Sequence, residues 1–178
     1  MLCLDLTCIW PTAVMTAGVT IRSASPNDFE PLGELYRDSI HRNPHGFIQD
    51  LTFHGCLIED ILAWRRAGGD FLVASSGDKL VGFGGLAPQN PRLAELCKLH
   101  VDSQWQGRGI GRLIAMELVE CARRVGFSDV ELHVTATQKA AIALYWSLGF
   151  REIDRRLFTT TVFGARTSFD TIYMNLAL

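Results

Sequence analysis

The feature that most constrains the fold is a glycine-rich run, residues 106–111 (Gln-Gly-Arg-Gly-Ile-Gly), between two regular segments. Residues 96–101 have the composition of a β-strand. After the run, apolar residues share one helical face, namely Ile110, Leu113, Ile114, Leu118, Cys121, Ala122 and Val125. Glycines at the start of a helix allow a ligand to approach the backbone, and the first helical N–H groups lack intrahelical acceptors. The run therefore predicts a site for a phosphate-bearing ligand.

Two common glycine motifs for phosphate fit this run poorly. A P-loop needs Gly, four residues and then Gly-Lys-Ser/Thr, and the sequence contains no such string. A dinucleotide fingerprint needs G-x-G-x-x-G near the beginning of a βαβ unit. Here the third glycine comes one residue early and Arg112 occupies its place. A dinucleotide ligand, with Asp129 or Glu131 as the ribose-binding acid, remains the weaker alternative.

The run does fit the pattern Gln/Arg-x-x-Gly-x-Gly/Ala, through Gln106, Gly109 and Gly111. This pattern resembles the pyrophosphate loop of the GNAT family of N-acetyltransferases. Residues 140–150 (Ala-Ala-Ile-Ala-Leu-Tyr-Trp-Ser-Leu-Gly-Phe) resemble the second signature of that family, a helix that carries a tyrosine and ends in Leu-Gly-Phe. Both signatures occur in the order and at the separation usual for the family, and the resemblance covers residues 19–178.

The resemblance implies a single-domain α/β fold, a mixed β-sheet of about seven strands with helices on both faces. It also implies that acetyl-CoA lies in an opening between the strands near residues 94–101 and 130–134. Backbone groups of Leu99 and Val101 would pair with its arm, and Gln138 stands where the family often has an asparagine that contacts the pantetheine. The positions assigned to acetyl-CoA are Leu99, His100, Val101, Gln106, Gly107, Arg108, Gly109, Ile110, Gly111, Arg112, Gln138 and Tyr145.

For the chemistry, the resemblance implies that Tyr145 protonates the departing thiolate. Glu95 is the candidate base, because it stands six residues before Val101, where the histone-acetylating branch of the family has its catalytic glutamate. Strand alternation predicts that Glu95 shares a face with Cys97, Leu99 and Val101. His100 and a water-mediated route are the alternatives for the base.

Composition restricts the partners. The chain has 178 residues, of which 48% are hydrophobic and 20% charged, as in an ordinary globular domain. A net charge of −2 does not indicate the basic surface that nucleic-acid-binding proteins use, so no nucleic-acid partner is expected. No apolar run approaches the length of a transmembrane helix, so no membrane partner is expected. The five cysteines are odd in number and scattered, which favours reduced thiols in a cytoplasm. No metal site is expected, because the ligand spacings of zinc sites are missing.

The order of predicted elements is β-α-α-β-β-β-α-β-α-β-β. Residues 18–178 form the expected domain, and residues 1–17 form an N-terminal extension that could be disordered, could pack against another subunit as in a homodimer, or could reflect a start codon assigned too early. Ser25, Pro26 and Asp28 predict the beginning of the first helix. Glycines 84 and 85 predict a β-bulge or a close backbone approach.

The sequence thus predicts an acetyl-CoA-dependent N-acetyltransferase that acts on a primary amine of a small molecule or a peptide. Two alternatives stay open: a CoA-binding pseudoenzyme or sensor, and a protein N-terminal acetyltransferase. The choice of acceptor is expected to lie in residues 41–56 and in the loop near residues 158–168.

Overall fold

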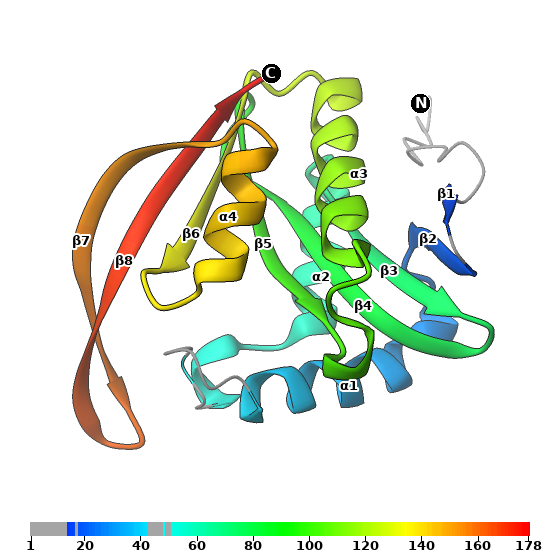
Figure 1. Ribbon diagram of the computed structural model, residues 1–178, viewed down its shortest axis with the longest axis horizontal. Helices are drawn as coiled ribbons and strands as arrows, with labels where there is room; N and C mark the ends of the chain where they lie inside the picture. Colours follow the sequence, from blue (N-terminus) through cyan, green and yellow to red (C-terminus); the bar gives the residue numbers. More distant parts are fainter. Residues whose placement is uncertain (1–13, 17, 43–47, 49–50) are drawn as a thin grey trace, which may run out of the picture.

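The computed structural model describes residues 14–16, 18–42, 48 and 51–178, which form one mixed β-sheet with helices on both faces (Figure 1). The strands are β1 (Val14–Thr16), β2 (Val19–Ser23), β3 (Asp70–Ser76), β4 (Lys79–Pro88), β5 (Leu93–Val101), β6 (Asp129–Thr135), β7 (Arg151–Val162) and β8 (Ala165–Ala177). The helices are α1 (Phe29–His41), α2 (Leu57–Arg66), α3 (Ile110–Val125) and α4 (Lys139–Ser147). Short 3-10 turns are η1 (Pro26–Asp28), η2 (Leu51–His54) and η3 (Ser103–Trp105).

The strands follow the order β1-β2-β3-β4-β5-β6-β8-β7. The pair β5–β6 is parallel, whereas the other pairs described are antiparallel. The expected fold class and order of elements are confirmed, and β1 adds a strand to those expected. This strand lies within the segment expected to be an extension, of which residues 1–13 and 17 are outside the described residues. No helix in the described part of the chain is long and apolar enough to cross a membrane.

Two apolar clusters hold the helices on the sheet. The cluster around α3 includes Ile114 and Leu118 and also contains Tyr145 and Phe150 from the α4 segment. The opposite face carries α1 and α2, whose buried side chains Leu32 and Ile61 belong to a second cluster. Each helix buries one stripe of side chains against the sheet, as amphipathic spacing predicts. The sheet therefore separates a face covered by α3 and α4 from a face covered by α1 and α2.

The beginning of α1 is fixed by the residues that the sequence indicated. Ser25 and Asp28 form a capping box, and Pro26 opens the η1 turn that leads into α1. Asp28 is buried and accepts two hydrogen bonds from the guanidinium of Arg22, at 2.6 and 2.7 Å. This contact holds the pKa of Asp28 well below its usual range. The pair thus connects the start of α1 to β2.

A bulge in β5 changes which face its side chains occupy. Lys98 has a φ of 53°, and the pairing with β4 shifts between Phe83 and Gly85. Ala94 and Leu96 pack toward α3 before the bulge, and Leu99 and Val101 pack there after it. The expectation that Glu95 shares a face with Leu99 and Val101 is therefore wrong, because the extra residue at the bulge reverses the alternation.

Gly84 and Gly85 lie on β4 beside this bulge, where α3 and α2 approach the two faces of the sheet. A Cβ atom at Gly84 would lie 2.9 Å from the Ile114 side chain on α3, and one at Gly85 would lie 2.6 Å from Trp64 on α2. Both helices therefore approach β4 more closely than another residue would allow. The predicted bulge and the close backbone approach are confirmed at this point of the sheet.

The strands β5 and β6 separate after a short pairing. Leu93, Ala94 and Glu95 pair with Asp129, Val130 and Glu131, and no pairing continues beyond them. Figure 1 shows β5 and β6 close together near the C-terminus and diverging toward the loop that precedes α3. The expected opening in the sheet is confirmed, and backbone groups of the second half of β5 face it.

Candidate active site

A cavity of about 100 Å³ lies at the opening between β5 and β6. Its walls come from α1, β4, β5, β6 and α4, which are distant in the sequence. The residues that line it are Tyr36, Ser39, Phe83, Leu96, Cys97, Lys98, Leu99, His100, His133, Val134, Gln138, Ala141 and Tyr145. Leu99, His100, Gln138 and Tyr145, which the sequence assigned to one site, are thus brought together.

The glycine-rich run forms a tight loop directly before α3. Gly107 and Gly109 have φ angles of 75° and 79°, which favour glycine, and a Cβ atom at either position would meet nothing within 4 Å. The first N–H of α3 with a helical acceptor is that of Leu113, which donates to the Gly109 carbonyl at 3.1 Å. The N–H groups of Ile110 and Gly111 precede it in the helix and remain available to an anion.

The edge of β5 that faces the opening is partly capped. Asp102 N–H donates to the Val81 carbonyl on β4 at 2.9 Å, so alternation directs the backbone groups of Val101 toward the opening. The Val101 carbonyl accepts a hydrogen bond of 3.0 Å from the Gln106 amide. Gln106 therefore ties the glycine loop to the end of β5, a structural contact in addition to the cofactor role expected for it.

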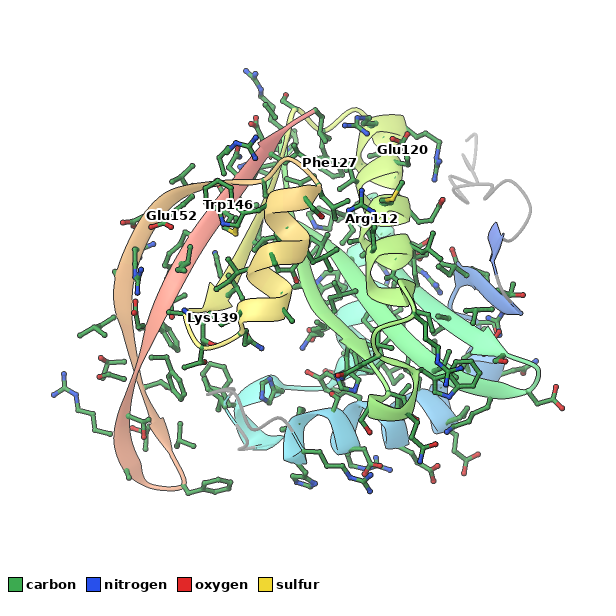
Figure 2. All side chains as sticks on the ribbon, in the orientation of Figure 1. Arg112, Glu120, Phe127, Lys139, Trp146 and Glu152 are labelled. Atoms are coloured by element: carbon green, nitrogen blue, oxygen red, sulfur yellow. The ribbon has the colours of Figure 1, made fainter. Side chains whose placement is uncertain are left out.

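The two arginines of the loop make contacts within the protein. The Arg108 guanidinium lies 4.7 Å from the centre of the Trp105 ring and donates to the Gln104 carbonyl. Arg112 donates to the Ser147 hydroxyl at 2.6 Å and so links α3 to α4 (Figure 2). Both side chains are exposed or partly exposed beside the loop, where a phosphate would meet them.

Tyr145 extends from α4 into the cavity. Its side chain is buried, and its ring lies edge-on to Phe150 with the ring centres 5.8 Å apart. Burial raises the pKa of the phenol, with a smaller contribution from Cys97, so the hydroxyl keeps its proton. Among the described residues this hydroxyl forms no hydrogen bond, and no buried side-chain oxygen there lacks a partner, so the hydroxyl oxygen itself is accessible from the cavity. A phenol that is buried except at its hydroxyl is available as a proton donor to a ligand in the cavity.

Gln138 stands directly before α4, at the edge of the same cavity. Its side-chain oxygen accepts a hydrogen bond of 3.2 Å from Thr135 N–H, which closes the turn between β6 and α4. Gln138 lines the cavity, and its side-chain amide also carries a nitrogen that can donate hydrogen bonds. The expected contact with the pantetheine arm stays a prediction.

Glu95 lies on the face of α1 and α2 and does not line the cavity itself. One carboxylate oxygen accepts a hydrogen bond of 3.0 Å from Gln89, and the other lies 3.6 Å from Nδ1 of His133 on β6. Burial raises the pKa of Glu95, and the charge of His133 opposes that rise. Sequence reasoning missed His133, because its position beside Glu95 depends on the parallel register of β5 and β6.

His100, the other candidate base, lies on the α1 and α2 side of the sheet. Its ring lies 5.5 Å from the Phe83 ring on β4. Burial lowers the pKa of His100 to about 4, and the charge of Asp102 only partly opposes this. A neutral imidazole of such low basicity is a weak proton acceptor at neutral pH.

Lys98, the residue at the bulge, lines the cavity with a charged side chain. Nothing in the sequence indicated that this lysine belongs to the site. Its Nζ donates to the Tyr36 hydroxyl at 2.8 Å and lies 3.6 Å from an Asp60 carboxylate oxygen. Burial opposes its charge, but the hydrogen bond to Tyr36 and the neighbouring acidic groups together raise the pKa of Lys98. These contacts join α1, α2 and β5 on the side of the cavity away from α4.

The two segments expected to choose the acceptor also meet. Phe53 in η2 and Phe158 in β7 lie with their ring centres 6.2 Å apart in an edge-on arrangement. Within the first segment, residues 43–47 and 49–50 lie outside the described residues. The aromatic contact joins the connection between α1 and α2 to the long β7–β8 hairpin.

Comparison with known proteins identifies the family. Residues 30–150 match the model of the "Acetyltransferase (GNAT) family". N-acetyltransferase 8 of Rattus norvegicus is 36% identical over 125 residues, covering 67% of this chain and 53% of the relative. The uncharacterized N-acetyltransferase YjgM of Escherichia coli is 34% identical over 100 residues, covering 54% of this chain and 60% of the relative. The chain spans about half the length of the curated relatives it matches.

Solved structures share the fold over nearly the whole chain. A putative acetyltransferase, yncA from Salmonella typhimurium with acetyl-CoA, matches with a TM-score of 0.74 and 24% identity, covering 90% of this chain and 94% of that one. The ribosomal-protein-alanine N-acetyltransferase of Brucella melitensis matches with a TM-score of 0.72 and 28% identity, covering 89% and 99%.

The chain belongs to the GNAT family of acetyltransferases. Three of the solved structures that share the fold contain acetyl-CoA. The family and the fold predicted from the sequence are thereby confirmed.

Proposed function

We propose that this chain transfers the acetyl group of acetyl-CoA to a primary amine by direct attack of the amine on the thioester. The observation that carries the proposal is Tyr145, a buried side chain whose hydroxyl is accessible in the cavity at the β5–β6 opening. The opening would receive the pantetheine arm, and the N–H groups at the beginning of α3 would hold the pyrophosphate. Arg108 and Arg112 would add charge-assisted contacts.

Each step of the transfer has a group that suits it. The ammonium of the acceptor first loses a proton, and the neutral nitrogen then forms a bond to the thioester carbon. Backbone N–H groups on β5 beside the opening would stabilise the tetrahedral oxyanion. The C–S bond then breaks, the sulfur takes the proton of Tyr145, and the amide nitrogen releases its second proton to solvent. The phenol is restored by a proton from solvent.

The acceptor we propose is a small amine. The cavity has a volume of about 100 Å³, and the contact between Phe53 and Phe158 joins the two segments that flank the acceptor side. Both features favour a compact acceptor over an extended peptide. A peptide acceptor remains the second candidate, because ribosomal-protein-alanine N-acetyltransferases are among the solved structures that share the fold.

The experiment is a two-stage measurement on the full chain. Thermal unfolding with acetyl-CoA is measured first, because a ligand at 100 times its Kd stabilises a fold by about 2.7 kcal/mol. Release of free CoA is then followed with polyamines, amino acids, aminoglycosides and a peptide with an N-terminal alanine. CoA release with a small amine supports the proposal, and release with the peptide alone would assign the second candidate. Acetyl-CoA binding without release would indicate a sensor.

A further inference from the structure

His133 lies on β6 at the point where β6 and β5 have just separated. Its neighbour Glu131 is the last residue of β6 that pairs with β5, where it stands opposite Glu95. Alternation places His133 on the same face as Glu131, one step beyond the end of the pairing. The imidazole therefore stands at the mouth of the opening, and it lines the cavity together with Tyr145 and Leu99.

The imidazole is held from two sides. On one side Nδ1 lies 3.6 Å from a carboxylate oxygen of Glu95. On the other side the ring lies 4.4 Å, centre to centre, from the ring of Tyr173, its cross-strand partner on β8. The Arg156 guanidinium on β7 lies over that tyrosine, 4.2 Å from its ring centre. The contacts with Glu95 and with the Tyr173–Arg156 pair thus fix the orientation of the His133 side chain.

The two members of the Glu95–His133 pair differ in access. The His133 side chain is 44% exposed and lines the cavity, whereas Glu95 is 25% exposed and lies behind it. Both carboxylate oxygens of Glu95 already have neighbours, Gln89 and His133. An acceptor amine in the cavity would therefore meet the imidazole, and its Nε2 is the atom left available by the contact at Nδ1.

We propose that His133 is the general base that deprotonates the acceptor ammonium, and that Glu95 is the positioning residue whose carboxylate faces its Nδ1 at 3.6 Å. This inference rests on the proposed acetyl transfer. In this step the N–H bond of the ammonium breaks and its proton moves to Nε2 of His133, leaving a lone pair on the acceptor nitrogen to attack the thioester. Glu95 stabilises the imidazolium that forms and itself takes no proton. The imidazolium returns its proton to solvent before the next turnover.

The charged groups nearest to His133 come from β5 and β7. The Glu95 carboxylate lies beside Nδ1, and the Arg156 guanidinium lies over the Tyr173 ring that contacts the imidazole. Lys98 lines the same cavity, and Glu131 shares the face of His133.

The test compares His133→Gln, Glu95→Gln and the control Glu131→Gln on an amine that the wild type acetylates. Glu131→Gln removes the same charge from the same face without a contact to the imidazole. We expect His133→Gln to lower kcat by about 10²–10⁴-fold and to remove the acidic limb of the pH profile of kcat/KM. Glu95→Gln should cause a smaller loss of kcat while the acidic limb persists, and Glu131→Gln should change kcat little. Acetyl-CoA thermal shifts should stay unchanged in all three variants.

A second measurement separates a base from a structural histidine. Imidazole added to His133→Ala should restore part of the rate. Full activity in His133→Gln, or a limb that disappears only in Glu95→Gln, would overturn the assignment while leaving acetyl transfer established. Acetyl-CoA binding without turnover of any amine by the wild type would instead refute the proposed function.

Discussion

The phenol of Tyr145 and the thiol of Cys97 line the same cavity, and burial raises the pKa of both groups. Both therefore remain protonated at neutral pH. A protonated thiol is a poor nucleophile, so Cys97 is not suited to form an acetyl-enzyme intermediate. A protonated phenol is what the departing thiolate of CoA requires, and the cavity thus favours direct transfer over a covalent route.

Tyr145→Phe should lower kcat by about 10²–10⁴-fold while the affinity for acetyl-CoA changes little. The substitution removes one hydroxyl and preserves the packing against Phe150. Steady-state CoA release and acetyl-CoA thermal shifts measure the two effects. Trp146→Phe is the matched control, because the neighbouring side chain is 46% exposed on the same helix (Figure 2). An unchanged kcat in Tyr145→Phe would assign this tyrosine to packing.

Gly109→Asp should abolish the stabilisation by acetyl-CoA in thermal unfolding. The left-handed φ of 79° strains any side chain there, and a carboxylate repels phosphate. Gly126→Asp is the control at the far end of α3, since Gly126 also has a left-handed φ and open space around it. Gly126→Asp should lose comparable stability and keep the acetyl-CoA shift. Retained binding in Gly109→Asp would place the pyrophosphate elsewhere.

His100 should make the fold less stable as the pH falls from 6.5 toward 4. Its pKa of about 4 in the folded state lies below the ordinary value of 6.5, so only the unfolded chain binds a proton in this window. The loss between pH 6.5 and about pH 5 should be about 2 kcal/mol. His100→Gln should remove this part of the pH dependence, measured by chemical denaturation at both pH values. An identical pH dependence in the variant would contradict the burial of His100.

Asp28→Asn should reduce the free energy of unfolding by about 2–3 kcal/mol, because Asp28 is buried against Arg22. Because the pKa of Asp28 is lowered in the folded state, the stability that this pair contributes should depend on pH. The contribution is present above the usual carboxyl pKa and is lost as the pH falls below that value. Asp38→Asn is the control, since Asp38 forms an exposed pair with Arg42 and should cost less than about 0.5 kcal/mol. Equal costs for both variants would show that the burial of Asp28 is immaterial.

Local signals in the sequence predicted much of the fold. Gly109 and Gly126 bound α3 at both ends, and Ser25 with Asp28 fixes the start of α1. Such features depend on residues within a few positions of one another, because capping and turn geometry are local. The opening between β5 and β6 followed from the family resemblance, and the described pairing confirms it.

The sequence alone determined the elements, the glycine loop at the beginning of α3 and the helix that carries Tyr145, because each is encoded by neighbouring residues. Tertiary structure decided the two features that change the chemistry. One is the bulge at Lys98, which reverses the alternation of β5 and separates Glu95 from the face of Leu99. The other is the contact of Glu95 with His133, which exists only because two strands far apart in the chain pair in parallel at one register. Periodicity assigns side chains to a face within one strand, whereas the register between strands depends on the whole packed sheet.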